Sequence, residues 1–364
     1  MKQNKPVILF GAGQTGMKAL EYYGWENIYC YVDKHKAGLY FCGIPVISID
    51  DLQKIKFDYR IIISTAPDSF EEIKQELDRA GIQGAVLYNP DYGKTYKKNP
   101  RLEKFKNMHK GKRCFLIGNG SSLRTEDLEI IDRHKDITFA SNRIFKIYKS
   151  TNWRPDYYFA GDQRYIIQNL DDIIAEKENK FIVYTKEYIT PDILSKLIDV
   201  KDLYLIKARY LQYDSENNKL LPFYEDLNEP YPSFSEDPSM FVYEGFSITY
   251  LMMQWAAYMG FSKLFLLGVD HNFKLTRNYF EKFIPSQEVP GEIANDHFST
   301  NYFKKDELIN IADLQSSTQA YGKAEQYSIE NGFRIYNATR GGNLEVFERV
   351  DFNVLMNNKS QVGD

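Results

Sequence analysis

The chain has 364 residues, with 46 Lys and Arg against 50 Asp and Glu, and a formal net charge of -4. A chain of this length can bury a core in each of two domains, and its 43% of hydrophobic residues exclude an intrinsically disordered protein. Because charges of both signs are interspersed, the composition argues against a dedicated nucleic-acid binder, and we expect no nucleic-acid partner.

The cysteines and the first residues bear on the cellular compartment. Cys30, Cys42 and Cys114 show no CxxC spacing, so they are interpreted as small core residues in a reducing environment. Met1–Lys5 meets a strand pattern at once, which leaves no room for a signal peptide. No run reaches about 18 apolar residues. We therefore expect a cytoplasmic protein; peripheral attachment to the inner membrane and oligomerisation stay open.

Residues 1–92 alternate strand and helix patterns and predict a small Rossmann-like domain of the nucleotide- or nucleotide-sugar-binding type. In chain order the patterns are strand Val7–Phe10, helix Thr15–Tyr23, strand Ile28–Val32, strand Arg60–Ser64, helix Phe70–Ala80 and strand Gly84–Tyr88. A polar stretch over 93–100 follows and is predicted to be a linker.

The first glycine-rich turn follows the first strand of this domain. Gly11, Gly13 and Gly16 give the spacing G-x-G-x-x-G, and Asp33 ends the next strand about 20 residues on. In a dinucleotide site the glycines admit the pyrophosphate and the acid binds a ribose hydroxyl. A bound nucleotide or nucleotide sugar and an accessory role in assembly both stay open. A nicotinamide-dependent dehydrogenase is disfavoured, because no substrate domain with a hydride-transfer His or Tyr pattern follows.

Residues 101–357 predict a second, larger α/β domain, and 358–364 a tail. Its strand patterns are Cys114–Ile117, Ile137–Ala140, Tyr157–Ala160, Phe181–Tyr184, Leu203–Ile206, Leu264–Leu267 and Arg334–Tyr336, and its helix patterns include Leu102–His109, Ser247–Met259 and Ala320–Asn331. Residues 208–244 and 272–310 are irregular and are interpreted as loops that bind the acceptor. The predicted fold class is therefore α/β, with two Rossmann-like parallel-sheet domains in tandem.

Polar side chains follow several strands of the second domain. The strand Cys114–Ile117 leads into a second glycine-rich turn, Gly118-Asn119-Gly120-Ser121-Ser122, while Asn142 follows the next strand and Asp162 the one after. Glycines let the backbone approach a ligand, and Asn and Ser add hydrogen-bonding groups. Since the carboxyl ends of parallel strands meet at one edge of a sheet, these residues predict a ligand site there. Each of them also fits a plain turn or a helix cap.

The remaining candidates lie in the last third of the chain. A fully apolar strand delivers Asp270 and His271 to the same edge, and Ser247 begins an apolar helix, as its N-cap or as a ligand contact. His297 lies in an irregular loop. The last strand is followed by Thr339 and Arg340, where an arginine between small residues suits a phosphate or carboxylate clamp.

Taken together, Gly118–Leu123, Asn142, Gly268-Val269-Asp270, His297 and Tyr336–Gly342 resemble one superfamily in order and spacing. It joins bacterial sialyltransferases of the Campylobacter type, motility accessory factors that glycosylate flagellin with nonulosonic acids, and archaeal 6-hydroxymethylpterin diphosphokinases. The chain is most similar to the bacterial diphosphokinase-like (DUF115-type) group. The first domain resembles short Rossmann modules fused ahead of sugar-modifying transferases, including those of bacterial sugar acetyltransferases, which hold a nucleotide sugar.

The resemblance implies that the Asn and Ser residues of the second turn, with Asn142, hold a cytidine nucleotide. We further expect the turn and the following helix N-terminus to bind the donor phosphate. The whole expected set of donor-binding residues is Gly118, Asn119, Gly120, Ser121, Ser122, Asn142, Asp162, Ser247, Thr339 and Arg340.

For catalysis, the resemblance implies that His297 is the base that deprotonates the acceptor hydroxyl, a task suited to a histidine near its ordinary pKa. Related sequences often carry a second histidine where this chain has Ser299, so His271 is held as the alternative base. Asp270 is expected to shape the site or to pair with a basic group. The resemblance further implies that Tyr302 corresponds to a tyrosine that contacts the donor phosphate.

The sequence thus favours a glycosyltransferase that moves a nucleotide-activated sugar, of the CMP-nonulosonic or sialic acid type, to a surface glycan acceptor. No D-x-D pair lies at a strand end, so the sequence requires no metal or other cofactor. The first alternative is a Mg²⁺-dependent diphosphokinase that acts on a hydroxymethylpterin-like alcohol, with Asp162 and Asp270 as metal carboxylates. The second alternative is a non-catalytic protein that binds a nucleotide sugar.

Overall fold

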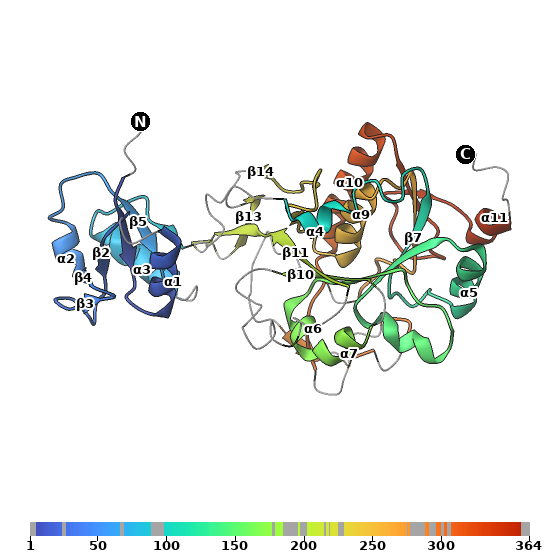
Figure 1. Cartoon of the computed structure of the whole chain (residues 1–364), viewed down its shortest axis with the longest axis horizontal. Coiled ribbons are helices and arrows are strands. Elements are labelled where there is room, and N and C mark those ends of the chain that lie inside the picture. The colour runs from blue at the N-terminus through green and yellow to red at the C-terminus, as the bar shows by residue number, and fades with distance from the viewer. Residues whose placement is uncertain are drawn as a thin grey trace. The chain divides into compact units, whose positions relative to one another are not determined.

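The computed structural model describes residues 5–23, 27–65, 69–88, 98–176, 179–184, 196, 202–214, 216–217, 219–224, 229–274, 276, 288–290, 296–299, 302–303 and 307–357. The chain divides into two compact units, residues 1–94 with 214–217, and the remainder. Each unit is built on a largely parallel sheet with helices packed against it (Figure 1), which confirms the predicted α/β class.

The first unit has a six-stranded sheet with the strand order β3-β4-β2-β1-β5-β6. Its elements are β1 Val7–Phe10, α1 Gln14–Tyr23, β2 Ile28–Val32, β3 Tyr40–Phe41, β4 Ile44–Ile47, α2 Ile49–Leu52, β5 Arg60–Ile63, α3 Phe70–Arg79 and β6 Val86–Leu87. Only β3 runs antiparallel to its neighbour, in a hairpin with β4 that the sequence patterns did not reveal. This hairpin turns at Cys42 and Gly43, which both have positive φ.

The second unit has a nine-stranded sheet with the order β15-β11-β10-β9-β8-β7-β16-β19-β20, and every neighbouring pair is parallel. Its strands are β7 Arg113–Ile117, β8 Ile137–Ser141, β9 Tyr157–Ala160, β10 Asn179–Tyr184, β11 Leu203–Arg209, β15 Val242–Tyr243, β16 Lys263–Leu267, β19 Arg334–Asn337 and β20 Glu348–Arg349. The chain adds strands on one side of β7 up to β15 and then returns to the other side with β16. The switch in strand order therefore lies between β7 and β16, where open α/β sheets bind their ligands.

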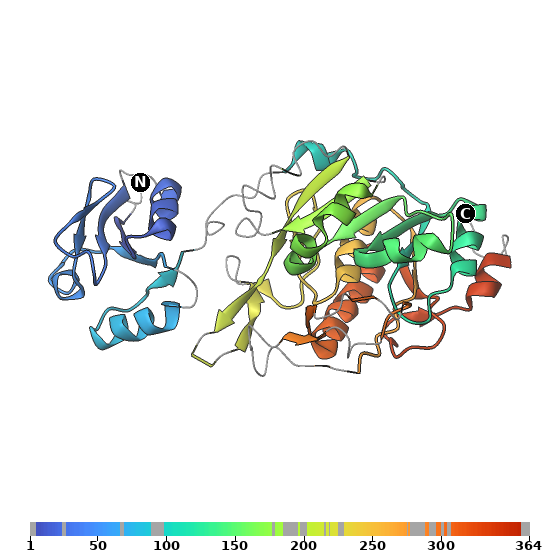
Figure 2. The same cartoon turned by 90° about the horizontal axis from the view of Figure 1, so that it is seen from below.

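Helices cover both faces of this sheet (Figures 1 and 2). One face carries α4 Pro100–Glu103, α9 Ile248–Tyr258 and α10 Leu314–Glu330; the other carries α5 Thr125–His134, the 3₁₀ segment η3 Asn142–Lys149, α6 Gln163–Gln168, α7 Leu170–Ala175 and α11 Phe352–Asn357. Helix α9 is apolar on nearly all sides, because it packs against the sheet and also against α10. Each face thus has its own hydrophobic core.

Two predicted helices need correction. The helix expected over Leu102–His109 ends at Glu103, and turns follow it, with Asn107 at positive φ. Helix α10 begins at Leu314, six residues before the expected Ala320, because Asp313 caps it through Ser316.

The two irregular stretches also contain strands. Within 208–244 lie β12 Leu211–Asp214, β13 Lys219–Tyr224 and β14 Glu229–Pro230, which form a three-stranded sheet, and within 272–310 β17 Glu288–Pro290 pairs with β18 Leu308–Asn310. The prolines of the first stretch concealed it, since proline is tolerated in a strand only at an edge or a bulge.

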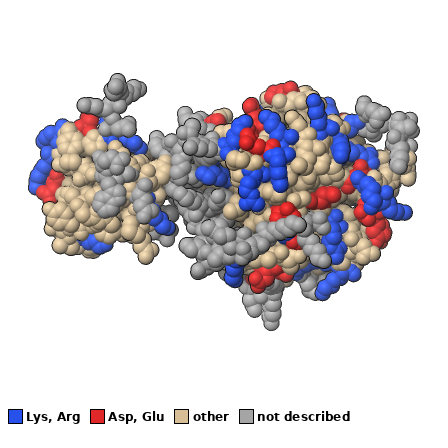
Figure 3. Space-filling view, viewed as in Figure 1, with Lys and Arg blue, Asp and Glu red and all other residues tan. Residues whose placement is uncertain are grey.

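In the part of the chain that the structure describes, none of the helices has the length and apolar character needed to cross a bilayer. On the visible face of the second unit, basic and acidic side chains lie among one another (Figure 3), as the small net charge predicts.

Candidate active site

The loops after β7 and β16 meet at the switch in strand order. The Gly118 amide donates to the Leu267 carbonyl at 2.8 Å, and the Gly120 amide to the Gly268 carbonyl at 2.8 Å. A Cβ on Gly118 would collide with the Gly268 carbonyl, and one on Gly120 with the carboxyl group of Asp270. The glycines of the second turn are therefore needed because two backbones pack against each other here.

Asp270 closes this turn. Its side chain is buried, with 5% exposed, and its oxygens accept hydrogen bonds from the Ser122 amide at 2.9 Å, the Ser121 hydroxyl at 3.1 Å and the Ser122 hydroxyl. Hydrogen bonds to a carboxylate are stronger than those between neutral groups. Asp270 therefore fixes the shape of the loop Gly118–Ser122, and the serine groups expected to bind a donor are directed at Asp270.

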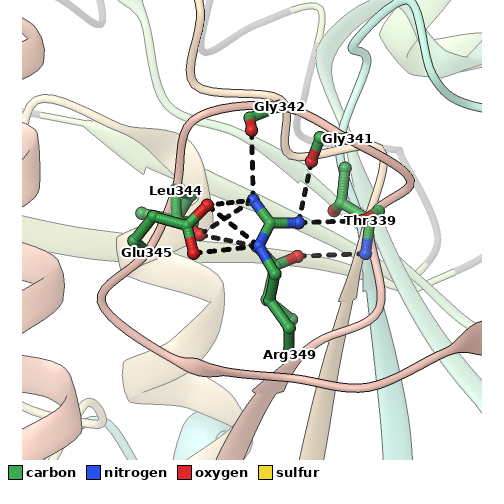
Figure 4. Close-up of polar contacts among 7 residues, drawn as sticks. Thr339, Gly341, Gly342, Leu344, Glu345 and Arg349 are labelled. Atoms are coloured by element: carbon green, nitrogen blue, oxygen red, sulfur yellow. Dashed lines mark hydrogen bonds and ion pairs between the residues drawn. The ribbon is translucent and has the colours of Figure 1, made fainter.

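A second loop, over residues 339–345, supports Asp270 from the other side. The Asn343 amide donates to the Asp270 carbonyl at 2.8 Å. This loop wraps around the guanidinium of Arg349, which donates to four of its carbonyls at 2.8–3.4 Å and to the Glu345 carboxylate (Figure 4). Arg349 therefore organises the loop, although no sequence motif singles it out.

Three buried polar atoms at this edge lack a hydrogen-bond partner within the part of the chain that the structure describes. The Asn119 Oδ1, Asn142 Oδ1 and His297 Nδ1 atoms are buried and have no hydrogen-bond partner among the described residues. The Nδ2 of Asn119 donates to the Ser141 carbonyl at 3.0 Å, which fixes the amide so that its oxygen is the free atom. An unsatisfied buried acceptor costs about 1–3 kcal/mol, so such a group of atoms indicates a site that a ligand completes.

His297 lies over the second turn. Gly120 and His297 form an isolated antiparallel bridge, and the Phe298 amide donates to the Asn119 carbonyl at 3.1 Å. The imidazole stacks on Tyr302, with ring centroids 3.8 Å apart and an interplanar angle of 12°. Burial lowers the pKa of His297 to about 4, against an opposing effect of Asp296. The ring is therefore neutral at neutral pH and is able to accept a proton, although as a weak base.

Asp162 and Ser247 also lie at this edge of the sheet. Each is the N-cap residue of the helix that follows it. Asp162 is exposed and accepts the Tyr165 amide at 2.8 Å at the start of α6, while its second oxygen faces Asn310. Ser247 accepts the Thr249 amide at 3.2 Å at the start of α9, and its hydroxyl pairs with that of Tyr321. Both capping roles leave the side chains at the carboxyl edge.

The other predicted residues at this edge have partners within the protein. His271 pairs with the Thr318 hydroxyl at 2.8 Å, and burial lowers the pKa of its imidazole. Thr339 is buried and accepts the Val269 amide at 3.1 Å. Arg340 forms an ion pair with Asp127 of α5.

Glu244 is a further candidate residue of this site, and the sequence patterns did not reveal it. It directly follows β15. Gln254 of α9 fixes the end of that strand, with bonds of 2.9 Å to both backbone groups of Tyr243. Burial, with a smaller effect of Asp162, raises the pKa of Glu244 to about 7. A two-residue strand leaves almost no hydropathy pattern in the sequence. The only sequence signal for Glu244 is an acidic residue shortly before a helix N-cap, here Ser247.

The acidic, histidine and cysteine side chains of the described ranges bear on metal binding. In the described ranges, no group of three or more His, Cys, Asp or Glu side chains is placed to hold a metal ion. Of the two carboxylates considered for Mg²⁺, Asp270 is bonded to Ser121 and Ser122, and Asp162 caps α6. The described side chains therefore do not form a fitting Mg²⁺ site.

The first glycine-rich turn is also closed by a carboxylate. Asp33 accepts the amides of Ala12 at 3.0 Å, His35 at 2.9 Å and Lys36 at 3.2 Å. A carboxylate has roughly four acceptor positions, and three are used here by the protein's own backbone. Because a ribose would need the same oxygens, these residues fit a dinucleotide poorly.

Comparisons with known proteins bear on both units. A family model described as "6-hydroxymethylpterin diphosphokinase MptE-like" matches residues 91–276, just over half of the chain, and one described as "C2185-like, N-terminal" matches residues 3–86. No curated protein matches.

Two solved structures are similar to the chain at low identity. The MAf glycosyltransferase from Magnetospirillum magneticum AMB-1 is 12% identical over 96% of this chain, with a TM-score of 0.38, and this chain covers 58% of its length. A DUF1611 family protein from Anabaena variabilis is 12% identical over 91% of this chain and 95% of its own length, with a TM-score of 0.20. The chain thus spans little more than half the length of the first of these structures.

Proposed function

The chain belongs to the 6-hydroxymethylpterin diphosphokinase MptE-like family, and from that membership and the geometry of its carboxyl edge we propose that it is a transferase with a nucleotide-bound substrate. The form that we favour is a glycosyltransferase. Its donor is a nucleotide-activated sugar, in the first place a CMP-activated nonulosonic acid, and its acceptor is a surface glycan. The donor and acceptor follow from the sequence resemblance to sialyltransferases and motility accessory factors.

One observation carries the proposal, the cluster of unpaired buried atoms at Asn119, Asn142 and His297. The two amide oxygens accept hydrogen bonds, so they complement N–H and O–H groups. The amino group of cytosine and the hydroxyls of a ribose are such donors, whereas a phosphate at neutral pH offers almost none. In this proposal the nucleoside of the donor therefore binds at Asn119 and Asn142.

The other residues of the edge then have distinct tasks. Asp270 holds the turn in the shape that presents Asn119, as its bonds to Ser121 and Ser122 support. His297, which is neutral at neutral pH, accepts the proton of the attacking acceptor hydroxyl. Arg340 is bonded to Asp127, so a contact with the donor phosphate requires it to exchange that partner.

The test is a thermal-shift titration of the whole protein with CMP, UMP, CDP, ATP and NAD, each with and without Mg²⁺. Ligands that bind only the native state raise Tm, and a concentration of 100 times Kd contributes about 2.7 kcal/mol. We expect CMP and CDP to raise Tm without Mg²⁺, and UMP to act more weakly because its O4 replaces the amino group of cytosine.

Other outcomes would contradict the proposal. A shift with ATP that needs Mg²⁺, without a shift with CMP, would support the diphosphokinase. A CMP shift without any transfer from CMP-activated sugars, and with His297→Gln fully functional in cells, would support a non-catalytic binding protein.

A further inference from the structure

A buried ion pair joins the start of η3 to the residue that precedes β18. Arg143 directly follows Asn142, and its guanidinium pairs with the Glu307 carboxylate. The side chains of Arg143 and Glu307 are only 3% and 6% exposed. Moving two charges out of water costs several kcal/mol for each ion. A pair this deeply buried is therefore poor evidence for stability and better evidence for a defined geometry.

Aromatic rings connect this pair to His297. The Arg143 guanidinium lies 5.6 Å from the ring centroid of Tyr302 and 5.1 Å from that of Phe303. Burial raises the pKa of Tyr302, and both Arg143 and the side chain of Asn119 oppose that effect. Tyr302 in turn stacks on His297, with ring centroids 3.8 Å apart. A displacement of Tyr302 would therefore move the imidazole.

From this arrangement we propose that Arg143 and Glu307 are positioning residues that hold His297 over the second glycine-rich turn through Tyr302. Neither residue needs to touch a substrate. The proposal rests on the proposed function only in treating His297 as the proton acceptor; the contacts themselves are independent of the donor. Its consequence is that removal of either charge releases His297 and Tyr302 from the sheet edge and exposes the imidazole.

The test follows the ionisation of His297 by NMR of histidine-labelled protein. The chain has five histidines, and the variant His297→Gln identifies the signal. In the wild type we expect His297 to titrate near pH 4, as its burial implies. In Arg143→Met and in Glu307→Gln the released ring should titrate at least about one pH unit higher, toward the ordinary value of roughly 6.5.

Glu307→Gln separates positioning from simple electrostatics by the sign of its effect. The Arg143 cation lowers the pKa of His297, so an unneutralised Arg143 in a fixed geometry would lower it further. Positioning predicts the opposite, a rise. A titration of His297 that is unchanged or lower in Glu307→Gln would overturn the proposal.

The matched control is Arg113→Met, which breaks the ion pair of Arg113 with Asp136 (2.7 Å) at the amino end of β7. This variant should leave the titration of His297 unchanged. If Glu307→Gln does not fold, Glu307→Asp keeps both charges and withdraws the carboxylate by one methylene. It should then raise the pKa of His297 by a smaller amount, and an unchanged value would count against the proposal. None of these readouts needs CMP binding or transfer, so a failure here is distinguishable from a failure of the proposed function.

Discussion

The two glycine-rich turns of this chain are built alike and differ in what surrounds them. In each, a carboxylate from a neighbouring strand end accepts backbone amides of the turn: Asp33 accepts Ala12, and Asp270 accepts Ser122. The difference lies in the unpaired polar atoms. All the buried side-chain atoms without a partner that occur in the described residues lie in the second unit, and three of them surround the second turn. Glycine spacing by itself therefore indicates only a tightly packed turn. Buried polar atoms without partners next to the turn are the better sign that a ligand binds there.

The largest loss of stability is expected when the carboxylate that closes the second turn, Asp270, is replaced, and a much smaller loss when Asp33 of the first turn is replaced. Asp270→Asn places an amide N–H₂ opposite the hydrogen-bond donors of Ser121 and Ser122, in a buried position. We expect a loss of about 2–4 kcal/mol of unfolding free energy, since hydrogen bonds to a charged group contribute roughly 1.5–3 kcal/mol, and no remaining CMP shift. Urea unfolding, followed separately for each unit, measures the change.

The matched variant of the first turn is Asp33→Asn. Its carboxylate is half-buried, so the loss should be about 1 kcal/mol or less, confined to the first unit and without effect on CMP binding. If Asp33→Asn abolished the CMP shift, the distinction between the two turns would be wrong.

A second prediction concerns the unpaired amide itself. Asn142 has a positive φ of 51°, so Asn142→Gly removes the amide without backbone strain. The affinity for CMP should fall at least about tenfold, or roughly 1.4 kcal/mol. The free protein should be at least as stable as the wild type, because the substitution removes a buried acceptor that has no hydrogen bond. Isothermal titration measures the affinity.

Lys135→Gly is the control for this substitution. Lys135 also has a positive φ, 57°, and ends α5 at an exposed position. It should leave the affinity for CMP unchanged. Equal losses in both variants would show that the effect is one of backbone conformation rather than of the amide.

A third prediction uses the low pKa of His297. The folded protein keeps this ring neutral to about pH 4, whereas the unfolded chain protonates it near pH 6.5. Stability is therefore lost as the pH falls from about 6.5 to 4. In His297→Gln this loss should be smaller, which a series of Tm values across the range reports. His35→Gln, at an exposed histidine of the first unit, should follow the wild type throughout.

An effect of the opposite sign is expected at Glu244, whose pKa is raised to about 7. The unfolded chain ionises this group near pH 4.5 while the folded protein still holds the proton, so stability falls as the pH rises from about 4.5 to 7. Glu244→Gln removes this penalty. Its Tm should equal that of the wild type at pH 4 and exceed it at pH 8. Equal values at pH 8 would mean that Glu244 titrates normally.

The sequence predicted which strand ends meet at the site better than it predicted which side chains bond to one another there. The apolar runs before Gly118, Asn142 and Asp270 identified three strands whose ends meet, because a buried parallel strand needs a continuous apolar pattern. The partners of these residues could not be predicted in the same way. Asp270 is 148 residues from Ser122, and Arg143 is 164 residues from Glu307, and no periodicity relates such distant positions.

Short elements set a second limit on prediction. Glu244 follows a strand of two residues, and Arg349 organises its loop through main-chain carbonyls, which any residue supplies. Bonds to main-chain carbonyls leave no mark on the residue types of the loop, so the sequence gives no sign of this role of Arg349. Helix α9, by contrast, was predicted almost to the residue, because its apolar sequence is long enough to carry a clear pattern.

The loop around Arg349 has a consequence for engineering. Its conformation depends on one planar cation that fits among four carbonyl groups and the Glu345 carboxylate. Arg349→Ala would leave a hollow with the shape and charge preference of a guanidinium ion. Millimolar guanidinium in solution, far below denaturing concentrations, would then act as a removable cofactor for the loop. The loop 339–345 holds Asp270, which in turn holds the second turn. In this variant, the conformation of all three would therefore depend on added guanidinium.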